Sequence, residues 1–235
     1  MKRISPSKRV PLETVLRKLK TLSNPKGVEV MERFGINPKN TLGVSIPNIR
    51  RIAKDVGTDH VLAQKLWASS IHEARILAGM VNDPSRVTDR QMENWVRDFD
   101  SWDVCDQVCG SLFDKTPLAY RKAMRWSRRK EEFVKRAGFV LMASLAVHDK
   151  KAKDRMFAEF LPIIRSESVD DRNFVKKAVN WALRQIGKRN LNLNKMAVHT
   201  AREIRKMNSK AARWIASDAL RELTDKKVLE RLRAH

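Results

Sequence analysis

The chain has 235 residues, of which 42% are hydrophobic and 32% are charged. This length allows one large domain or two small ones, and the high charge with a mean hydropathy of -0.50 excludes a membrane protein. Lys and Arg total 49 against 27 Asp and Glu, and the net charge of +22 predicts a polyanionic partner, above all nucleic acid. An anionic membrane surface or the ribosome would satisfy the same charge less specifically.

The N-terminal residues 1–11 are basic and are not followed by an apolar segment. They predict a flexible basic arm, not a signal peptide. In the middle of the chain, the longest stretch without a charged residue is 137–148, which is too short to span a bilayer. We therefore expect a cytoplasmic protein.

Helical periodicity recurs in short blocks along the chain, without convincing period-two segments. Helices are expected, to within a few residues, at 12–22, 26–35, 47–56, 59–67, 70–82, 88–99, 102–113, 117–129, 131–147, 151–164, 170–188, 194–206, 209–222 and 225–233. Short links predict stacked helix pairs in a single domain over residues 12–235. The expected fold is all-α, an α-solenoid of about six HEAT-like repeats of ~35–40 residues that form a concave basic surface and act as a monomer. A generic helical bundle is the alternative.

Residues that carry metal or redox chemistry are sparse. The isolated glycines match no nucleotide-binding fingerprint, and the five histidines lack metal-ligand spacing, so no cofactor and no metal are predicted. Cys105 and Cys109 lie four residues apart in an apolar helical stripe. We expect them to be small core residues and not a disulfide or a redox pair.

The first basic motif is the stretch 42–51, LGVSIPNIRR. Ser45 can cap the helix that Pro47 starts, and Arg50 and Arg51 fall in its early turns. Such a helix start directs backbone N–H groups and cations towards a phosphate. An ordinary helix start explains the pattern equally well.

The stretch 100–106, DSWDVCD, places an aromatic ring beside a carboxylate. Trp102 and Asp106 lie one turn apart on one helical face, at the margin of the apolar stripe, whereas Asp103 points nearly opposite that stripe. A packed indole with an unrelated surface carboxylate is the simpler alternative.

A second cluster lies at the charged start of the segment 131–147, which has no charged residue after Arg136 and must be buried on most sides. Lys135 and Arg136 occupy this start. The Arg136 guanidinium can pair with Asp106 or bind a phosphate through two hydrogen bonds. A structural ion pair with another carboxylate is the alternative.

The segment 170–188 carries an aromatic residue within a basic row. Its members, spaced 4, 3 and 4 residues apart along one exposed helical stripe, are Lys177, Trp181, Arg184 and Lys188. Cations suit phosphates and a ring suits a sugar or base, so the row predicts a nucleic-acid contact. A ring lying on aliphatic stems is the alternative. Trp214 follows Arg213 in a similar pattern, but its position favours the core.

Together these stretches resemble the AlkD-like DNA alkylation repair enzymes, a family of HEAT-repeat DNA glycosylases. The likeness runs from about Phe34 to the end of the Trp181 helix. The matching stretches are 42–50 (LGVSIPNIR), 101–106 (SWDVCD), 135–137 (KRA) and 177–184 (KAVNWALR). Each is weak alone, but four in this order with similar separations are specific. The sequence departs from the family at Phe34 and Ser45, where a Tyr and a Gln are common.

The resemblance implies excision of cationic N3- and N7-alkylpurines from double-stranded DNA, without a tight base pocket. It implies that Asp106 is the catalytic carboxylate and Trp102 its aromatic partner, with Arg136 beside the DNA backbone and Trp181 as a second aromatic. The expected DNA contacts are Ser45, Arg50, Arg51, Lys135, Lys177, Arg184 and Lys188. A fixed carboxylate stabilises an oxocarbenium-like sugar and orients water, as in glycoside hydrolysis.

Three other functions remain open at this stage. The first is a non-catalytic HEAT-repeat protein that binds damaged or branched nucleic acid. The second is a protein-interaction scaffold, which the charge of +22 disfavours. The third is a glycosylase with lyase activity through a lysine such as Lys135, although no feature of the sequence marks a lysine with a lowered pKa.

Overall fold

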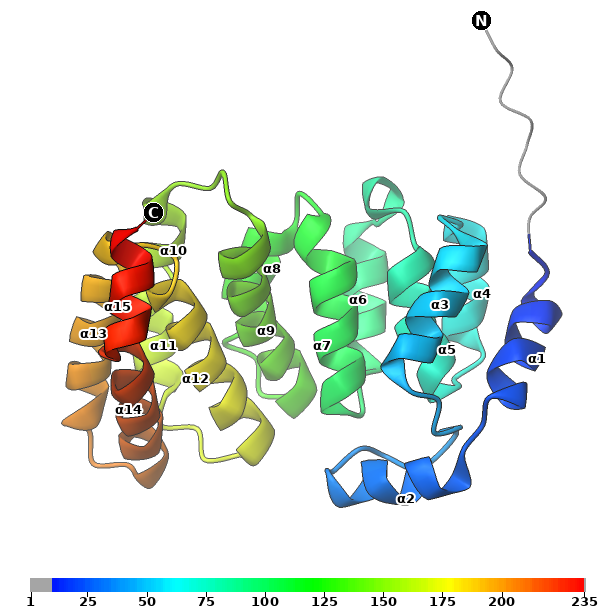
Figure 1. The fold of residues 1–235 in the computed structure, drawn as a ribbon, viewed down its shortest axis with the longest axis horizontal. Helices are drawn as coiled ribbons and strands as arrows, with labels where there is room; N and C mark the ends of the chain where they lie inside the picture. Colours follow the sequence, from blue (N-terminus) through cyan, green and yellow to red (C-terminus); the bar gives the residue numbers. More distant parts are fainter. Residues whose placement is uncertain (1–9, 235) are drawn as a thin grey trace, which may run out of the picture. The chain divides into compact units, whose positions relative to one another are not determined.

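The computed structural model describes residues 10–234, so most of the expected N-terminal arm lies outside the described residues. The described residues form fifteen α-helices and two short 3-10 helices, without a strand (Figure 1). Contacts divide them into two compact units that meet in sequence between Thr88 and Asp89. This confirms the predicted all-α class.

The first unit packs around α5, which contacts α1, α3 and α4. Its helices are α1 (Leu12–Thr21), α2 (Pro25–Arg33), α3 (Ile46–Val56), α4 (His60–Ala68), α5 (His72–Val81) and the 3-10 helix η1 (Pro84–Arg86). Leu19, Ile49, Leu66 and Leu77 are fully buried between them. The unit thereby holds the start of α3, where the basic motif lies.

A buried carboxylate fixes the loop that leads into α3. Glu73 on α5 is fully buried, and its Oε1 atom accepts hydrogen bonds from the backbone N–H groups of Leu42, Gly43 and Val44 at 3.0, 2.7 and 3.1 Å. Gly43 has φ +76°, and a Cβ atom there would lie 2.1 Å from the carbonyl oxygen of Asn24, so the turn requires glycine. The residues that fix this loop, Asn24 and Glu73, lie far from it in the sequence, so no local motif identifies them.

Replacing Glu73 by Gln is expected to lower the free energy of unfolding by about 2–3 kcal/mol, because the amide loses the charge that binds three buried N–H donors. Amide exchange at residues 42–44 should become faster. The matched control is Asp83→Asn, which alters a solvent-accessible carboxylate that accepts a hydrogen bond from the Ser85 backbone N–H and should leave stability nearly unchanged. Unchanged exchange at the loop of the Glu73 variant would contradict this role.

The second unit packs around α9, which contacts α7, α8 and α12 (Figure 1). Its helices are α6 (Asp89–Arg97), α7 (Trp102–Ser111), η2 (Phe113–Lys115), α8 (Ala119–Trp126), α9 (Glu132–His148), α10 (Asp154–Ala158), α11 (Leu161–Glu167), α12 (Asn173–Gly187), α13 (Leu191–Arg205), α14 (Lys210–Leu223) and α15 (Lys226–Arg233). The residues of α9 from Arg136 through Ala146 are all buried, as its lack of charge predicted.

Three hydrogen bonds between helices of this unit share one sequence offset. Asn180 bonds Asp218 and Arg184 bonds Glu222, both 38 residues apart, so α12 and α14 run parallel. The Arg136 side chain reaches the Phe174 carbonyl on α12 with the same offset of 38. These offsets agree with the predicted repeat length of ~35–40 residues.

One expected helix, 151–164, is wrong: the chain forms two short helices there, α10 and α11. Pro162 sits in the first turn of α11, where its missing N–H is harmless. Within one continuous helix, its ring would clash with the carbonyl of Ala158. The other expected helices are present with ends within three residues.

Candidate active site

The carboxylate of Asp106 is held by two hydrogen bonds from Arg136. The guanidinium Nε lies 3.0 Å from Oδ1 and Nη2 lies 2.8 Å from Oδ2. The side chains of Arg136 and Asp106 are 7% and 17% exposed. The pair therefore has the two-point geometry that fixes both orientation and distance, and a small part of the Asp106 side chain remains accessible to solvent.

The third arm of Arg136 fixes the pair to another helix. Its Nη1 donates to the carbonyl oxygen of Phe174 at 2.6 Å, and the Phe133 and Phe174 rings pack with centroids 5.6 Å apart. One side chain on α9 thus joins α7 through Asp106 and α12 through the main chain. The carboxylate is held in position by three helices of the second unit.

Burial and charge act in opposite directions on this pair. Burial raises the pKa of Asp106, although the charge and hydrogen bonds of Arg136 act to lower it. Burial acts to lower the pKa of Arg136, but the adjacent Asp106 raises it above its ordinary value. The guanidinium accordingly stays charged at every pH at which the protein is folded.

Two indoles lie on the helices that Arg136 connects. Trp102 is one turn before Asp106 on α7, and Trp181 is on α12; both side chains are half-buried. Their positions at the margin of the core leave part of each ring accessible. The second unit therefore carries the carboxylate, the guanidinium and both aromatic residues that the sequence singled out.

Asp103 does not behave as its helical position suggested. It is 8% exposed, and its Oδ1 accepts a hydrogen bond of 2.9 Å from the backbone N–H of Val104. The expectation that it points away from the core is wrong because α7 is covered on more sides than its apolar stripe defines. Cys105 and Cys109 are buried and form no disulfide, as predicted.

The predicted DNA-binding residues of the first unit lie at the start of α3. Ser45 occupies the N-cap position of the helix, as expected, and is exposed, but the expected capping hydrogen bond from its side chain is absent. Arg50 and Arg51 are exposed, and Arg51 bonds the Asn48 side chain at 2.7 Å. These cations are accessible to an anionic partner.

The cations of the second unit are less free than the sequence indicated. Arg184 and Lys188 each lie 2.6 Å from a carboxylate oxygen of Glu222, and Lys135 bonds Glu167 at 2.7 Å and Asp170 at 3.1 Å. The prediction of an exposed row on α12 is therefore wrong for Arg184 and Lys188, whereas Lys177 is exposed. The neutralising acids lie 32 to 38 residues away.

The Lys135 cluster predicts a specific acid sensitivity. Burial acts to raise the pKa of Asp170, but hydrogen bonds from Arg172 and Lys135 lower it to about 2. Because this folded-state pKa is below that of an unfolded Asp, ionised Asp170 stabilises the protein above about pH 4, and the effect disappears as the pH falls towards 2.

We expect Asp170→Asn to lower the free energy of unfolding by on the order of 1 kcal/mol at pH 7, a value reduced for solvent screening. The difference from wild type should shrink between about pH 5 and pH 2. Urea unfolding at pH 7, 4 and 3 measures it, and a pH-independent difference would contradict the assignment.

The structure also corrects the expectation for Trp214. It is 42% exposed and not part of the core, and the Lys176 ammonium lies 5.1 Å from the centroid of its ring. The sequence signal was its neighbour Arg213, which repeats the pairing of a cation with an indole. Trp214 is exposed because small residues, such as Ala211 and Ala212, already fill the buried side of α14.

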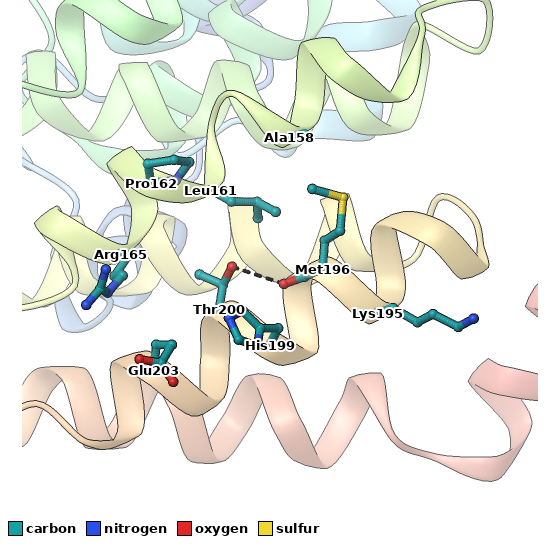
Figure 2. A pocket seen from close by; sticks show the side chains of 9 residues that line it. All are labelled: Ala158, Leu161, Pro162, Arg165, Lys195, Met196, His199, Thr200 and Glu203. Carbon is teal, nitrogen blue, oxygen red and sulfur yellow. Dashed lines mark hydrogen bonds between the residues drawn. The ribbon is translucent and has the colours of Figure 1, made fainter.

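An apolar groove lies elsewhere in the second unit, between α11 and α13 (Figure 2). It encloses about 490 Å³, and its lining residues are Ala158, Leu161, Pro162, Arg165, Lys195, Met196, His199, Thr200 and Glu203. None of the candidate site residues belongs to it. The groove is therefore separate from the carboxylate and its indoles.

Comparisons with known proteins agree with this fold. A solved structure from a family of proteins related to the HEAT-like repeat DNA glycosylases with affinity for branched DNA structures is similar to this chain, with a TM-score of 0.74 and 20% identity. The similarity covers 91% of this chain and 96% of that chain. The described helices thus form a HEAT-like repeat fold. No curated protein matches the chain.

The family of DNA alkylation repair enzymes matches residues 15–223. The chain therefore belongs to this family. Among the described residues, no helix has the length and apolar character needed to cross a membrane.

Proposed function

We propose that the protein is a monofunctional DNA glycosylase that hydrolyses the N-glycosidic bond of cationic N3- and N7-alkylated purines. The proposed substrate is double-stranded DNA, bound by a cytoplasmic monomer without a metal or cofactor. The observation that carries this proposal is the fixed carboxylate of Asp106, whose side chain is largely buried but keeps 17% of its surface exposed. Arg136 holds it at 2.8 and 3.0 Å, beside Trp102 on the same helix.

The chemistry needs few groups, and the residues present supply them. An alkylated purine already carries positive charge, so it leaves without a general acid. Loss of the base develops positive charge at the sugar C1′ atom. The Asp106 carboxylate stabilises that charge and orients the attacking water. The faces of Trp102 and Trp181 add cation–π attraction on the order of 0.5–2 kcal/mol each.

Arg136 acts in this proposal as a positioning residue. Its two hydrogen bonds prevent rotation of the carboxylate, so the negative charge meets the sugar without reorganisation during the reaction. Its hydrogen bond to the Phe174 carbonyl keeps the guanidinium from turning away from Asp106 to pair with a DNA phosphate. Cations on α3 and α12, including Arg50, Arg51 and Lys177, bind phosphates of the substrate.

The state of Lys135 argues against a lyase reaction. Burial acts to lower the pKa of Lys135, but hydrogen bonds from Glu167 and Asp170 raise it overall. A protonated amine cannot form a Schiff base with an abasic sugar. Borohydride treatment of the protein with abasic DNA should therefore leave no covalent complex.

A second candidate function is binding of branched DNA without catalysis. The pairing of both Asp106 oxygens with Arg136 favours it, because the guanidinium partly neutralises the charge that catalysis uses. The similar solved structure belongs to proteins with affinity for branched DNA. Phe34, where the resembled family often has Tyr, is 68% exposed, and Ser45 is exposed as well.

The test is release of 7-methylguanine and 3-methyladenine from methylated duplex DNA by the full-length protein. Chromatography of the released bases should show both, with alkali-sensitive abasic sites in the DNA. Binding to the same DNA, measured by fluorescence anisotropy, is the control. Binding without release of either base would reject the glycosylase and leave the second candidate.

A further inference from the structure

An exposed indole and several cations lie outside the candidate active site, at the amino-terminal ends of α12 and α14. The Trp214 side chain is 42% exposed, and the Lys176 ammonium lies 5.1 Å from its ring centroid. The ammonium lies over the ring, and a large part of the Trp214 surface remains accessible. Burial does not explain this Trp, because Ile215 and Ala216 fill the core side of α14.

The parallel register of α12 and α14 shows where this indole points. Asn180 bonds Asp218 and Arg184 bonds Glu222 with one offset, and Lys176 contacts Trp214 with that same offset, one turn earlier. The contact between Lys176 and Trp214 is therefore the first of three evenly spaced contacts along the seam between α12 and α14.

Helical rotation then relates the indole to the candidate site. Successive residues rotate by about 100° around a helix, so Lys177 after Lys176 and Arg213 before Trp214 turn to the same side of the seam. Trp181 turns to that side as well. Neighbouring helices lie ~10 Å apart, so the axes of the two helices that carry Trp214 and Trp181 are separated by a distance of a few nucleotides.

The balance of charge differs between the two ends of this seam. At its carboxyl-terminal end, Asp218 and Glu222 neutralise Arg184 and Lys188. At its amino-terminal end, the exposed cations are Lys177, Lys210 and Arg213, and none of the three has an ion-pair partner within residues 10–234. The unpaired cations therefore lie at the same end of the seam as the exposed Trp214.

We infer that Trp214, Lys176 and Arg213 form a second DNA subsite, which stacks an unpaired base of a strand flanking the candidate active site. Bases within a duplex cover one another, so a duplex offers an indole no free base face, whereas a single-stranded flank or flap does. The cations bind the phosphates on either side of the stacked base. This inference rests on the proposed binding of DNA and adds a preference for substrates with an unpaired strand.

The test compares two fluorescent DNA probes of one sequence, a blunt duplex and the same duplex with a single-stranded thymidine flap. Wild type should bind the flapped probe more tightly. Trp214→Ala should weaken flap binding about tenfold, the loss of one stacked base, and change blunt-duplex binding less than twofold. Trp214→Phe should retain most of the preference because it keeps an aromatic face.

The matched control is Met196→Ala, which removes another exposed apolar side chain, 37% exposed, from α13. It should bind both probes like wild type. Arg213→Gln should weaken both probes and reduce the salt dependence of binding. Equal affinity of Trp214→Ala and wild type for the flapped probe would overturn the inference, as would an equal loss on both probes.

The outcome is distinguishable from failure of the glycosylase proposal. A protein that releases no base from methylated DNA but loses its flap preference in Trp214→Ala has the subsite without the enzyme activity. A protein that releases methylated bases but binds both probes alike, with or without Trp214, has the activity without the subsite.

Discussion

Asp106→Asn is expected to lower base release from methylated duplex DNA by at least about 10²–10³-fold, while the affinity for the same DNA changes by less than a factor of about three. The amide has the size of the carboxylate but lacks the charge that stabilises the developing oxocarbenium-like sugar. DNA binding depends on phosphate contacts elsewhere, so it survives. Single-turnover release and fluorescence anisotropy measure the two effects separately.

The substitution also leaves the Arg136 guanidinium without an anionic partner, and a loss of folding must be distinguished from a loss of chemistry. The matched control is Asp89→Asn in the same unit, because Asp89 pairs with Arg121 and Lys122 at 2.6 and 2.9 Å. Both variants remove one carboxylate from an ion pair. Equal base release by Asp106→Asn and Asp89→Asn would exclude Asp106 from catalysis, whatever their thermal stabilities.

Gly138→Ala is expected to lower the free energy of unfolding by about 3 kcal/mol, a large effect for one methyl group. A Cβ atom at Gly138 would lie 2.3 Å from the backbone nitrogen of Ser127 and 2.9 Å from the carbonyl carbon of Trp126. These are backbone atoms of the α8 end, so no side-chain rotation relieves the clash. The helices must separate, which moves Arg136, two residues earlier on α9.

The matched control is Gly110→Ala on α7, where the Cβ atom would meet the Ser144 Oγ atom at 3.3 Å and no backbone atom. Alanine is the better helix former by roughly 0.5–1 kcal/mol, so this variant should be as stable as wild type or slightly more so. Urea unfolding of both variants makes the comparison. Equal stability of the two would show that α8 and α9 separate without cost.

The sequence predicted those features of the site that depend on local spacing. Helical periodicity predicted α7, α9 and α12 to within a few residues, and one-turn spacing placed Trp102 beside Asp106. Both Asp106 and Arg136 lie at charged margins of apolar helices. The sequence therefore left two partners open for Arg136, the Asp106 carboxylate or a phosphate. The structure shows the pair.

Features that depend on distant residues could not be predicted in this way. Glu73 binds a loop 29 to 31 residues earlier, and Glu222 neutralises cations 34 and 38 residues earlier. No periodic pattern connects such partners, because the packing of different helices brings them together. The break before Pro162 differs from these, since proline within an expected helix is itself a local signal.

Under the proposed function, the acids along the α12–α14 seam have a kinetic consequence, because a DNA glycosylase must search long stretches of undamaged DNA. Each cation bound to a phosphate releases about one counterion, and this release drives non-specific binding. Arg184 and Lys188, already paired with Glu222, contribute little to that release. In a DNA glycosylase, this pairing is expected to shorten the time spent on each undamaged site and to speed transfer to the next. A net charge of +22 would then not hold the protein on every duplex that it meets.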